Sequence, residues 1–166
     1  MKDNLIARLI TETTAYDCGD PRRIQHFMKV HNFARTIGIL EGLDDKTLFT
    51  LEAAAVVHDI GIHASEKKHH STAGCWQEKE GPPIAGELLT RLGFDPKMTQ
   101  RVCFLVGHHH TYHDIIGLDY QILVEADFLV NLYEDNAPET AVQQALRTIF
   151  RTKSGSRLCQ DLFGLS

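Results

Sequence analysis

The hydrophobic residues of this 166-residue chain recur at steps of three and four positions along most of its length. This spacing is typical of helices that bury one face, and alternating strand-like patterns are almost absent. The pattern predicts helices over residues 2–16, 21–41, 45–60, 72–80, 82–92, 96–110, 119–134, 138–151 and 155–163. The apolar run at 102–106 could also be a buried strand, but its place before a histidine cluster favours a helix. We therefore predict an all-α fold with short connections.

Polar residues mark where several of these helices begin. Asp20 and Asp95 each precede a proline, and proline suits the first position of a helix. Asp44 and Asp119 precede runs with helical periodicity and are candidate N-caps, because a short side-chain oxygen can accept from the free N–H groups of a first turn.

The composition indicates one globular domain. Apolar residues make up 43% of the chain, and no repeat, low-complexity tract or long linker divides it. We predict a single domain over residues 1–166, with residues 138–163 as a helical C-terminal extension. The sequence shows no signal peptide or membrane span, and its four cysteines are widely separated, so we expect a cytoplasmic protein with free thiols.

The net charge of −5 argues against general nucleic-acid binding, which needs a broad positive surface. It is compatible with a small phosphorylated substrate, which needs only a local positive site, and it leaves a homodimer open. The chain also has ten histidines, most of them in two clusters at 58–70 and 108–113. This clustering favours a metal site over scattered surface histidines.

Ionisable side chains interrupt three of the predicted apolar faces. His31, His58 and Asp127 each fall in the apolar stripe of a different helix, and Asp59 follows His58 directly. One such residue alone is more often a hydrogen-bonded core residue than a ligand. Together they favour a cation, because a buried carboxylate is costly without one. Two imidazoles and two carboxylates suit Mn, Fe, Ni, Co or Zn better than Ca, so we predict that His31, His58, Asp59 and Asp127 hold a divalent transition metal.

The same residues resemble the signature of the HD-domain phosphohydrolase superfamily. His31, the doublet in AAAVVHDIG and the aspartate of ILVEADFLV follow its H…HD…D order over residues 21–134, and GPPIAGELLTRLGF followed by LVGHHHTY resembles many bacterial members. The resemblance implies a compact helical bundle around a central metal site formed by those four residues. It also implies hydrolysis of a phosphate ester. We therefore expect the substrate to be a small phosphorylated metabolite, and a nucleotide is the first expectation.

Several positions depart from the patterns of known members. Relatives with two metals often carry a histidine in a His-Pro-x-x-Gly motif where this chain has Pro82, so one metal is expected rather than two. Nucleotidase members often have a glutamate where this chain has Ile62. The lysine and the Gly-Tyr-Pro motif of members that hydrolyse cyclic dinucleotides are also missing.

A second histidine cluster follows the predicted helix 96–110. His108 and His109 are candidates for a second metal or for the substrate phosphate, although a histidine there can also simply cap the helix end. For catalysis we assign Asp59 to the metal and to the orientation of water. His109 is the candidate donor to the leaving group.

Three cationic side chains are candidates for binding the substrate. His63 and Lys67 lie on a predicted loop after the doublet, and Arg23 lies at a helix start. Each could bind a phosphate, and solvent exposure is the alternative for each.

Two other functions stay open at this point. A di-iron oxygenase is a chemistry that some HD-fold relatives perform, but it needs two irons. A non-catalytic sensor would bind metal or nucleotide without turning over any phosphoester.

Overall fold

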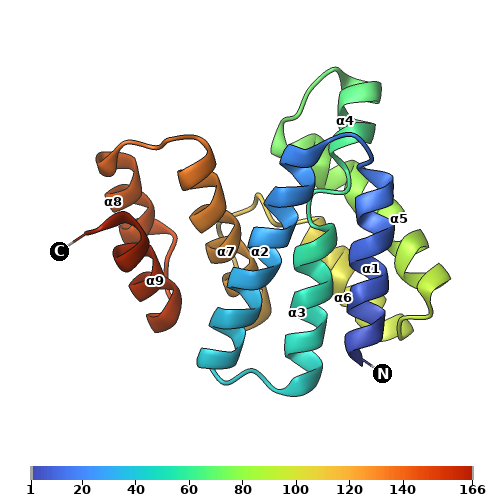
Figure 1. Cartoon of the computed structure of the whole chain (residues 1–166), viewed down its shortest axis with the longest axis horizontal. Helices are drawn as coiled ribbons and strands as arrows, with labels where there is room; N and C mark the ends of the chain where they lie inside the picture. The colour runs from blue at the N-terminus through green and yellow to red at the C-terminus, as the bar shows by residue number, and fades with distance from the viewer. Residues whose placement is uncertain (1, 166) are drawn as a thin grey trace.

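The computed structural model describes residues 2–165, and all regular elements within this range are helices (Figure 1). They are α1 (Lys2–Tyr16), α2 (Pro21–Leu40), α3 (Asp45–Val57), α4 (Ile62–His69), α5 (Gly74–Leu92), α6 (Pro96–Val106), α7 (Leu118–Glu134), α8 (Glu139–Thr148) and α9 (Lys153–Phe163). The all-α prediction is confirmed. None of the helices described is both long and apolar enough to cross a membrane.

The helices surround α2 and α3, which pack against each other near the middle of the molecule (Figure 1). α7 packs on α2 and α3, while α1 and α6 contact α3. α5 packs along α6 and carries α4, which projects at one end. α8 and α9 pack together, and α9 contacts α7 at the end of the molecule away from α1. Fully buried residues such as Val30, Leu51 and Leu123 form one continuous core between these helices.

Side-chain caps explain where three helices begin. Asp20 accepts from the backbone N–H of Arg23, Asp44 caps α3, and Asp95 caps α6. The predicted cap at Asp119 is wrong, because α7 begins one residue earlier with Gly117 at the N-cap. Asp119 instead accepts from the Arg101 guanidinium at 2.6 and 2.9 Å, and this ion pair ties α7 to α6.

The segment 61–71, predicted as a loop between two helices, contains α4. Its sequence is short and charged, so the apolar periodicity gives little signal. Ser65 is buried, and its hydroxyl donates to the Ser71 carbonyl at 2.6 Å, which closes the turn that follows the helix. His70 ends α4 in the left-handed conformation with φ 52°.

The predicted break at Pro82 is also wrong, because α5 continues through Pro82 and Pro83. The glycine before the two prolines is closely packed. A Cβ on Gly81 would lie 2.7 Å from a methyl group of Val106, and a Cβ on Gly61 would lie 2.7 Å from the backbone N of Gly81. The glycines therefore allow the turn that follows the His-Asp doublet to press directly against α5.

A buried carboxylate joins the C-terminal helices to the bundle. Glu125 on α7 accepts from the backbone N–H groups of Arg151 and Thr152 at 2.6 and 2.9 Å. The Thr152 hydroxyl donates to the other carboxylate oxygen, and Thr152 is also the N-cap of α9. These contacts fix where α9 begins.

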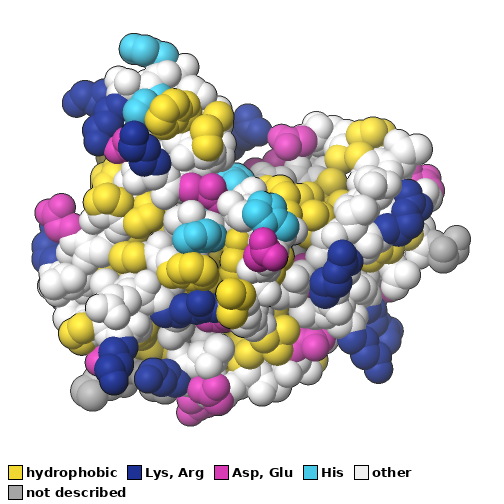
Figure 2. All heavy atoms as spheres, turned by 180° about the vertical axis from the view of Figure 1, so that it is seen from behind, with side chains coloured by type: hydrophobic (Ala, Val, Ile, Leu, Met, Phe, Trp, Pro, Cys, Tyr) yellow, Lys and Arg dark blue, Asp and Glu magenta, His cyan; other side chains and the backbone are white. Residues whose placement is uncertain are grey.

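The surface carries charges of both signs. On the face shown in Figure 2, Lys and Arg side chains lie in separate small groups among acidic ones, and histidine side chains lie near the middle of the face. This face therefore offers no broad positive surface of the kind that general nucleic-acid binding needs.

Candidate metal centre

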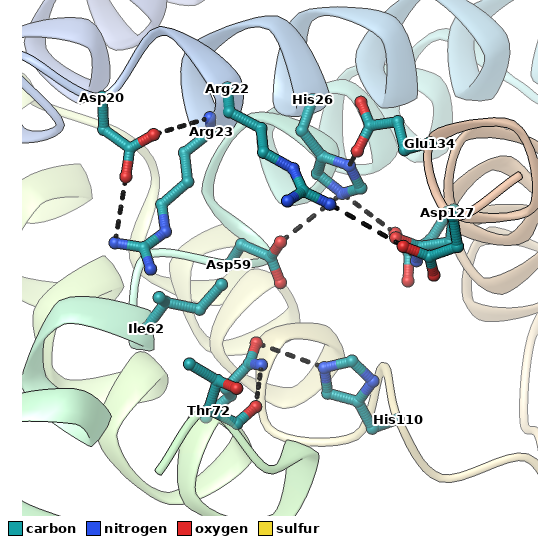
Figure 3. Close-up of a pocket in the computed structure, with 13 residues that line it drawn as sticks. Asp20, Arg22, Arg23, His26, Asp59, Ile62, Thr72, His110, Asp127 and Glu134 are labelled. Carbon is teal, nitrogen blue, oxygen red and sulfur yellow. Dashed lines mark hydrogen bonds and ion pairs between the residues drawn. The ribbon is translucent and has the colours of Figure 1, made fainter. Parts of the chain in front are cut away.

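Four side chains from three elements converge at the floor of a pocket, and Figure 3 shows three of them, His26, Asp59 and Asp127. His26 comes from α2, His58 and Asp59 from the turn after α3, and Asp127 from α7; we call them the central cluster. The His26 Nε2 atom lies 3.2 Å from the His58 Nε2, 3.1 Å from an Asp127 oxygen and 3.4 Å from an Asp59 oxygen. The His58 Nε2 lies 3.5 Å from each carboxylate.

The central cluster contains three of the four predicted residues, with His26 in place of His31. The prediction that His31 converges on the other three is wrong. Its Nε2 lies 3.0 Å from a carboxylate oxygen of Glu52 on α3. The two histidines are five residues apart, so they point about 140° apart around the helix. His26 shares the buried face with Val30, and sequence reasoning missed this second stripe on α2.

Hydrogen bonds at the far side of each ring decide which nitrogen faces the centre. The Nδ1 of His58 donates to the Ala55 carbonyl at 2.8 Å, and the Nδ1 of His26 donates to the Glu134 carboxylate at 2.9 Å. Each Nε2 is then left with a lone pair, and the two lone pairs face each other across 3.2 Å. Two facing lone pairs repel unless a cation lies between them. The donor set therefore fits a divalent transition metal.

The electrostatics of the central cluster also favour positive charge. Burial lowers the pKa of His58, but the carboxylates of Asp59 and Asp127 outweigh burial and raise it to about 9. Burial likewise opposes a charged His26, yet the Asp127 carboxylate raises its pKa. Burial raises the pKa of Asp127, but the two imidazoles outweigh this and hold it well below its usual range. A proton or a metal cation would satisfy the same groups.

We expect the metal-free protein to lose stability as the pH rises from about 6.5 to about 9. The pKa of His58 is raised from 6.5 to about 9 in the fold, so its proton stabilises the fold fully below pH 6.5 and is lost as the pH rises through 9. The contribution is on the order of 3 kcal/mol. The depressed carboxylate pKa values act only in acid, outside this window. Thermal denaturation with chelator should show the loss, and a melting temperature that rises over this range would contradict the account.

A second group of ligand atoms adjoins the central cluster. Asp59, His109 and His110 bring one potential ligand atom each within 4.8 Å of one another. The Nδ1 of His109 donates to the Val106 carbonyl at 2.8 Å, which leaves its Nε2 facing Asp59 at 3.2 Å. Asp59 thus has one oxygen on the central cluster and the other on His109.

His110 is oriented by its neighbours in α5. Its Nε2 donates to the Gln77 side-chain oxygen at 3.2 Å, and the Gln77 amide N–H donates to the Thr72 carbonyl, which fixes the orientation of the amide. Burial and His109 lower the pKa of His110 to about 4. His110 is therefore held as a neutral imidazole, and its Nε2 is already used by Gln77.

The structure separates the histidines of the second predicted cluster. His108 is half-buried, stacks on Phe104 at a centroid distance of 4.2 Å and belongs neither to the pocket wall nor to the second group, so the structure does not place it at a second metal or the phosphate. His109 is fully buried and is not part of the pocket wall. The predicted role of His109 as a donor to the leaving group therefore lacks an approach to substrate. His110, which was not among the predicted site residues, does line the pocket.

The pocket above the central cluster has a volume of about 440 Å³. Of the three predicted substrate-binding residues, only Arg23 lines it. Arg23 contacts Glu66 at 2.7 Å and Asp20 at 3.2 Å, so its charge is already neutralised. His63 lies 2.9 Å from Asp17 and accepts from Arg23, while Lys67 is exposed and lies outside the pocket wall.

Comparison with known proteins identifies the family. Residues 23–146 match the family model of the HD domain. The fold is similar to the crystal structure of a predicted HD superfamily hydrolase from an uncultured Thermotogales bacterium, with a TM-score of 0.66 and 25% identity over 96% of this chain and 83% of that one. No curated protein matches the sequence. Because the family model covers most of the chain and the fold agrees with it, this protein belongs to the HD domain family.

Proposed function

We propose that this protein is a metal-dependent phosphohydrolase that acts on a small phosphorylated metabolite. The observation that carries the proposal is the convergence of two imidazole Nε2 atoms and two carboxylates at the floor of an open pocket. Mn, Fe, Ni, Co or Zn suits this donor set. A bound divalent cation would polarise a phosphoryl oxygen and lower the pKa of a water molecule.

The chain's own residues have distinct roles in this proposal. His26, His58 and Asp127 are buried and hold the cation together with Asp59, which also faces the pocket and His109 and orients the incoming water. His109 acts through Asp59 as a positioning residue, because it has no access to the pocket. We propose one ion at the central cluster, since the Nε2 of His110 is already bound to Gln77.

A di-iron oxygenase remains the second candidate because of one observation. The second group places Asp59 between two sets of histidines, and a carboxylate in that position can bridge two metal ions. The two functions differ in the number of metal ions bound per chain and in their need for oxygen. An oxygenase requires two irons per chain and consumes oxygen, whereas the proposed hydrolase needs neither.

A screen for turnover tests the proposal. Chelated protein, re-supplied separately with Mn, Co, Ni, Zn or Fe, is assayed for phosphate release on nucleotides, sugar phosphates and phosphodiesters. We expect release from at least one class with at least one metal, and no release while the chelator is in excess. Full metal binding without turnover on any substrate would favour a sensor, and oxygen consumption with two irons bound would favour the oxygenase.

A further inference from the structure

Most of the residues that line the pocket have polar side chains. Ile62 is its one aliphatic residue, and among its lining residues the only rings are the imidazoles of His26 and His110. The remaining lining side chains are charged, amide or hydroxyl groups. Pockets that bind a drug-like or aromatic ligand are usually lined with apolar and aromatic side chains, so this pocket has a different specificity.

Three aromatic side chains lie close in sequence to residues that line the pocket, and each packs against another ring. Trp76 stacks on His69 at a centroid distance of 3.8 Å, and Tyr112 packs edge-on against Phe128 at 5.1 Å. Tyr16 packs against His63 at 5.8 Å. None of these residues belongs to the pocket wall. Among the described residues, the pocket wall therefore includes no Phe, Tyr or Trp ring on which a nucleobase could stack.

One cation of the wall is available to an anionic ligand. Arg22 has a side chain that is 75% exposed, and its ion pair with Asp135 is loose at 3.7 Å. Figure 3 shows the Arg22 side chain reaching over the pocket from α2, near His26. Arg23, its neighbour in sequence, is held by Asp20 and Glu66. Arg22 is thus placed to bind a phosphate oxygen that projects away from the central cluster.

Hydrogen-bond acceptors lie on the same side of the pocket as Arg22. Asp135 is 67% exposed and follows α7 directly. One turn earlier, Asn131 uses its amide N–H to donate to Asp127 at 2.8 Å, so its carbonyl oxygen is left as an acceptor. A carboxylate and an amide oxygen next to each other suit ligand hydroxyl groups, which must donate to an acceptor.

We infer that the pocket recognises a hydroxyl-rich phosphate ester, such as a sugar or polyol phosphate, and takes no binding energy from a base. This inference rests on the proposed function and specifies its substrate class. The phosphate lies between the central cluster and Arg22. The hydroxyl groups lie against Asp135 and Asn131.

Two substrates that differ only by the base test this directly. We expect kcat/KM for ribose 5-phosphate to equal that for the matching 5′-nucleotides within about threefold, because stacking of a base on a protein ring contributes on the order of tenfold to a hundredfold where it occurs. A preference for nucleotides of more than about thirtyfold would overturn the inference and leave the phosphohydrolase proposal standing. Turnover on phosphodiesters alone would also overturn the inference and leave the phosphohydrolase proposal standing. Absence of turnover on every substrate class of the screen with every metal would overturn both.

Two variants test the assigned contacts. Arg22→Gln should raise KM for ribose 5-phosphate by about tenfold with unchanged metal content, whereas Arg91→Gln, an exposed arginine paired with Glu12, should not. Asp135→Ala should lower kcat/KM for ribose 5-phosphate relative to p-nitrophenyl phosphate, which has no hydroxyl groups. An unchanged ratio in Asp135→Ala, or an unchanged KM in Arg22→Gln, would overturn the assignment of that residue.

Discussion

Replacing His26 by alanine should weaken divalent-cation binding by more than about 100-fold. Loss of a residue that only supports a metal ligand typically lowers metal affinity by about 10- to 100-fold, and loss of a ligand itself should cost more. His26 brings its Nε2 within 3.1–3.4 Å of the other three members of the central cluster. Without it, the cation loses one of only two imidazoles there. Calorimetric titration of Mn²⁺ into chelated protein measures the change.

His31→Ala is the matched control, since it removes the same side chain from the same helix. Its partner Glu52 keeps an ion pair with Arg35 at 3.2 Å, so we expect a loss of stability of about 1 kcal/mol or less and unchanged metal affinity. Wild-type affinity in His26→Ala, or loss of metal in His31→Ala, would show that the central cluster has been assigned to the wrong histidine.

Asp59→Asn should reduce phosphate release to the background rate. The substitution keeps the shape of the side chain but removes the charge that faces His26, His58 and His109. Metal binding should weaken as well, because a neutral amide is a poorer ligand than a carboxylate. Initial rates should therefore be measured at saturating metal as well as at equal metal concentration.

Asp161→Asn provides the comparison for this variant. Asp161 is an exposed residue of α9 that pairs with Arg157, far from the pocket wall, so its loss should leave turnover unchanged. Near-normal turnover by Asp59→Asn at saturating metal would refute the role proposed for Asp59.

Local sequence signals were enough to predict most helices and the His-Asp doublet. Asp20, Asp44 and Asp95 each place a side-chain acceptor before an apolar-periodic run, and each caps a helix as expected. His58 directly follows the apolar stripe of α3, Asp127 lies within that of α7, and both are buried. Signals of this kind depend only on residues that are close together in the sequence, so they can be recognised in a single sequence.

The choice between His26 and His31 depended on packing that the sequence does not contain. α2 packs against α3 on one side and α7 on another, so two apolar stripes of the helix are buried. Each stripe carries one histidine. Only the position of α7, which brings Asp127, determines which of them meets the doublet.

Two local errors have a similar physical origin. A proline normally ends a helix, because it lacks an N–H group and clashes with the preceding turn. In α5 the close contact of Gly81 with Val106 accompanies a helix that continues past Pro82. α4 is short and charged, so its helical form depends on tertiary contacts such as that of Ser65 with Ser71.

The most direct test is the rate of phosphate release by chelated wild-type protein as Mn²⁺ is added, with bound metal per chain measured in the same samples. The account predicts no release without metal and a rate that rises in proportion to occupancy of one site. It also predicts that His31→Ala follows the same curve, while His26→Ala stays at the background rate at the same metal concentrations. Full occupancy without turnover on any phosphate ester, or release that is indifferent to the chelator, would contradict it.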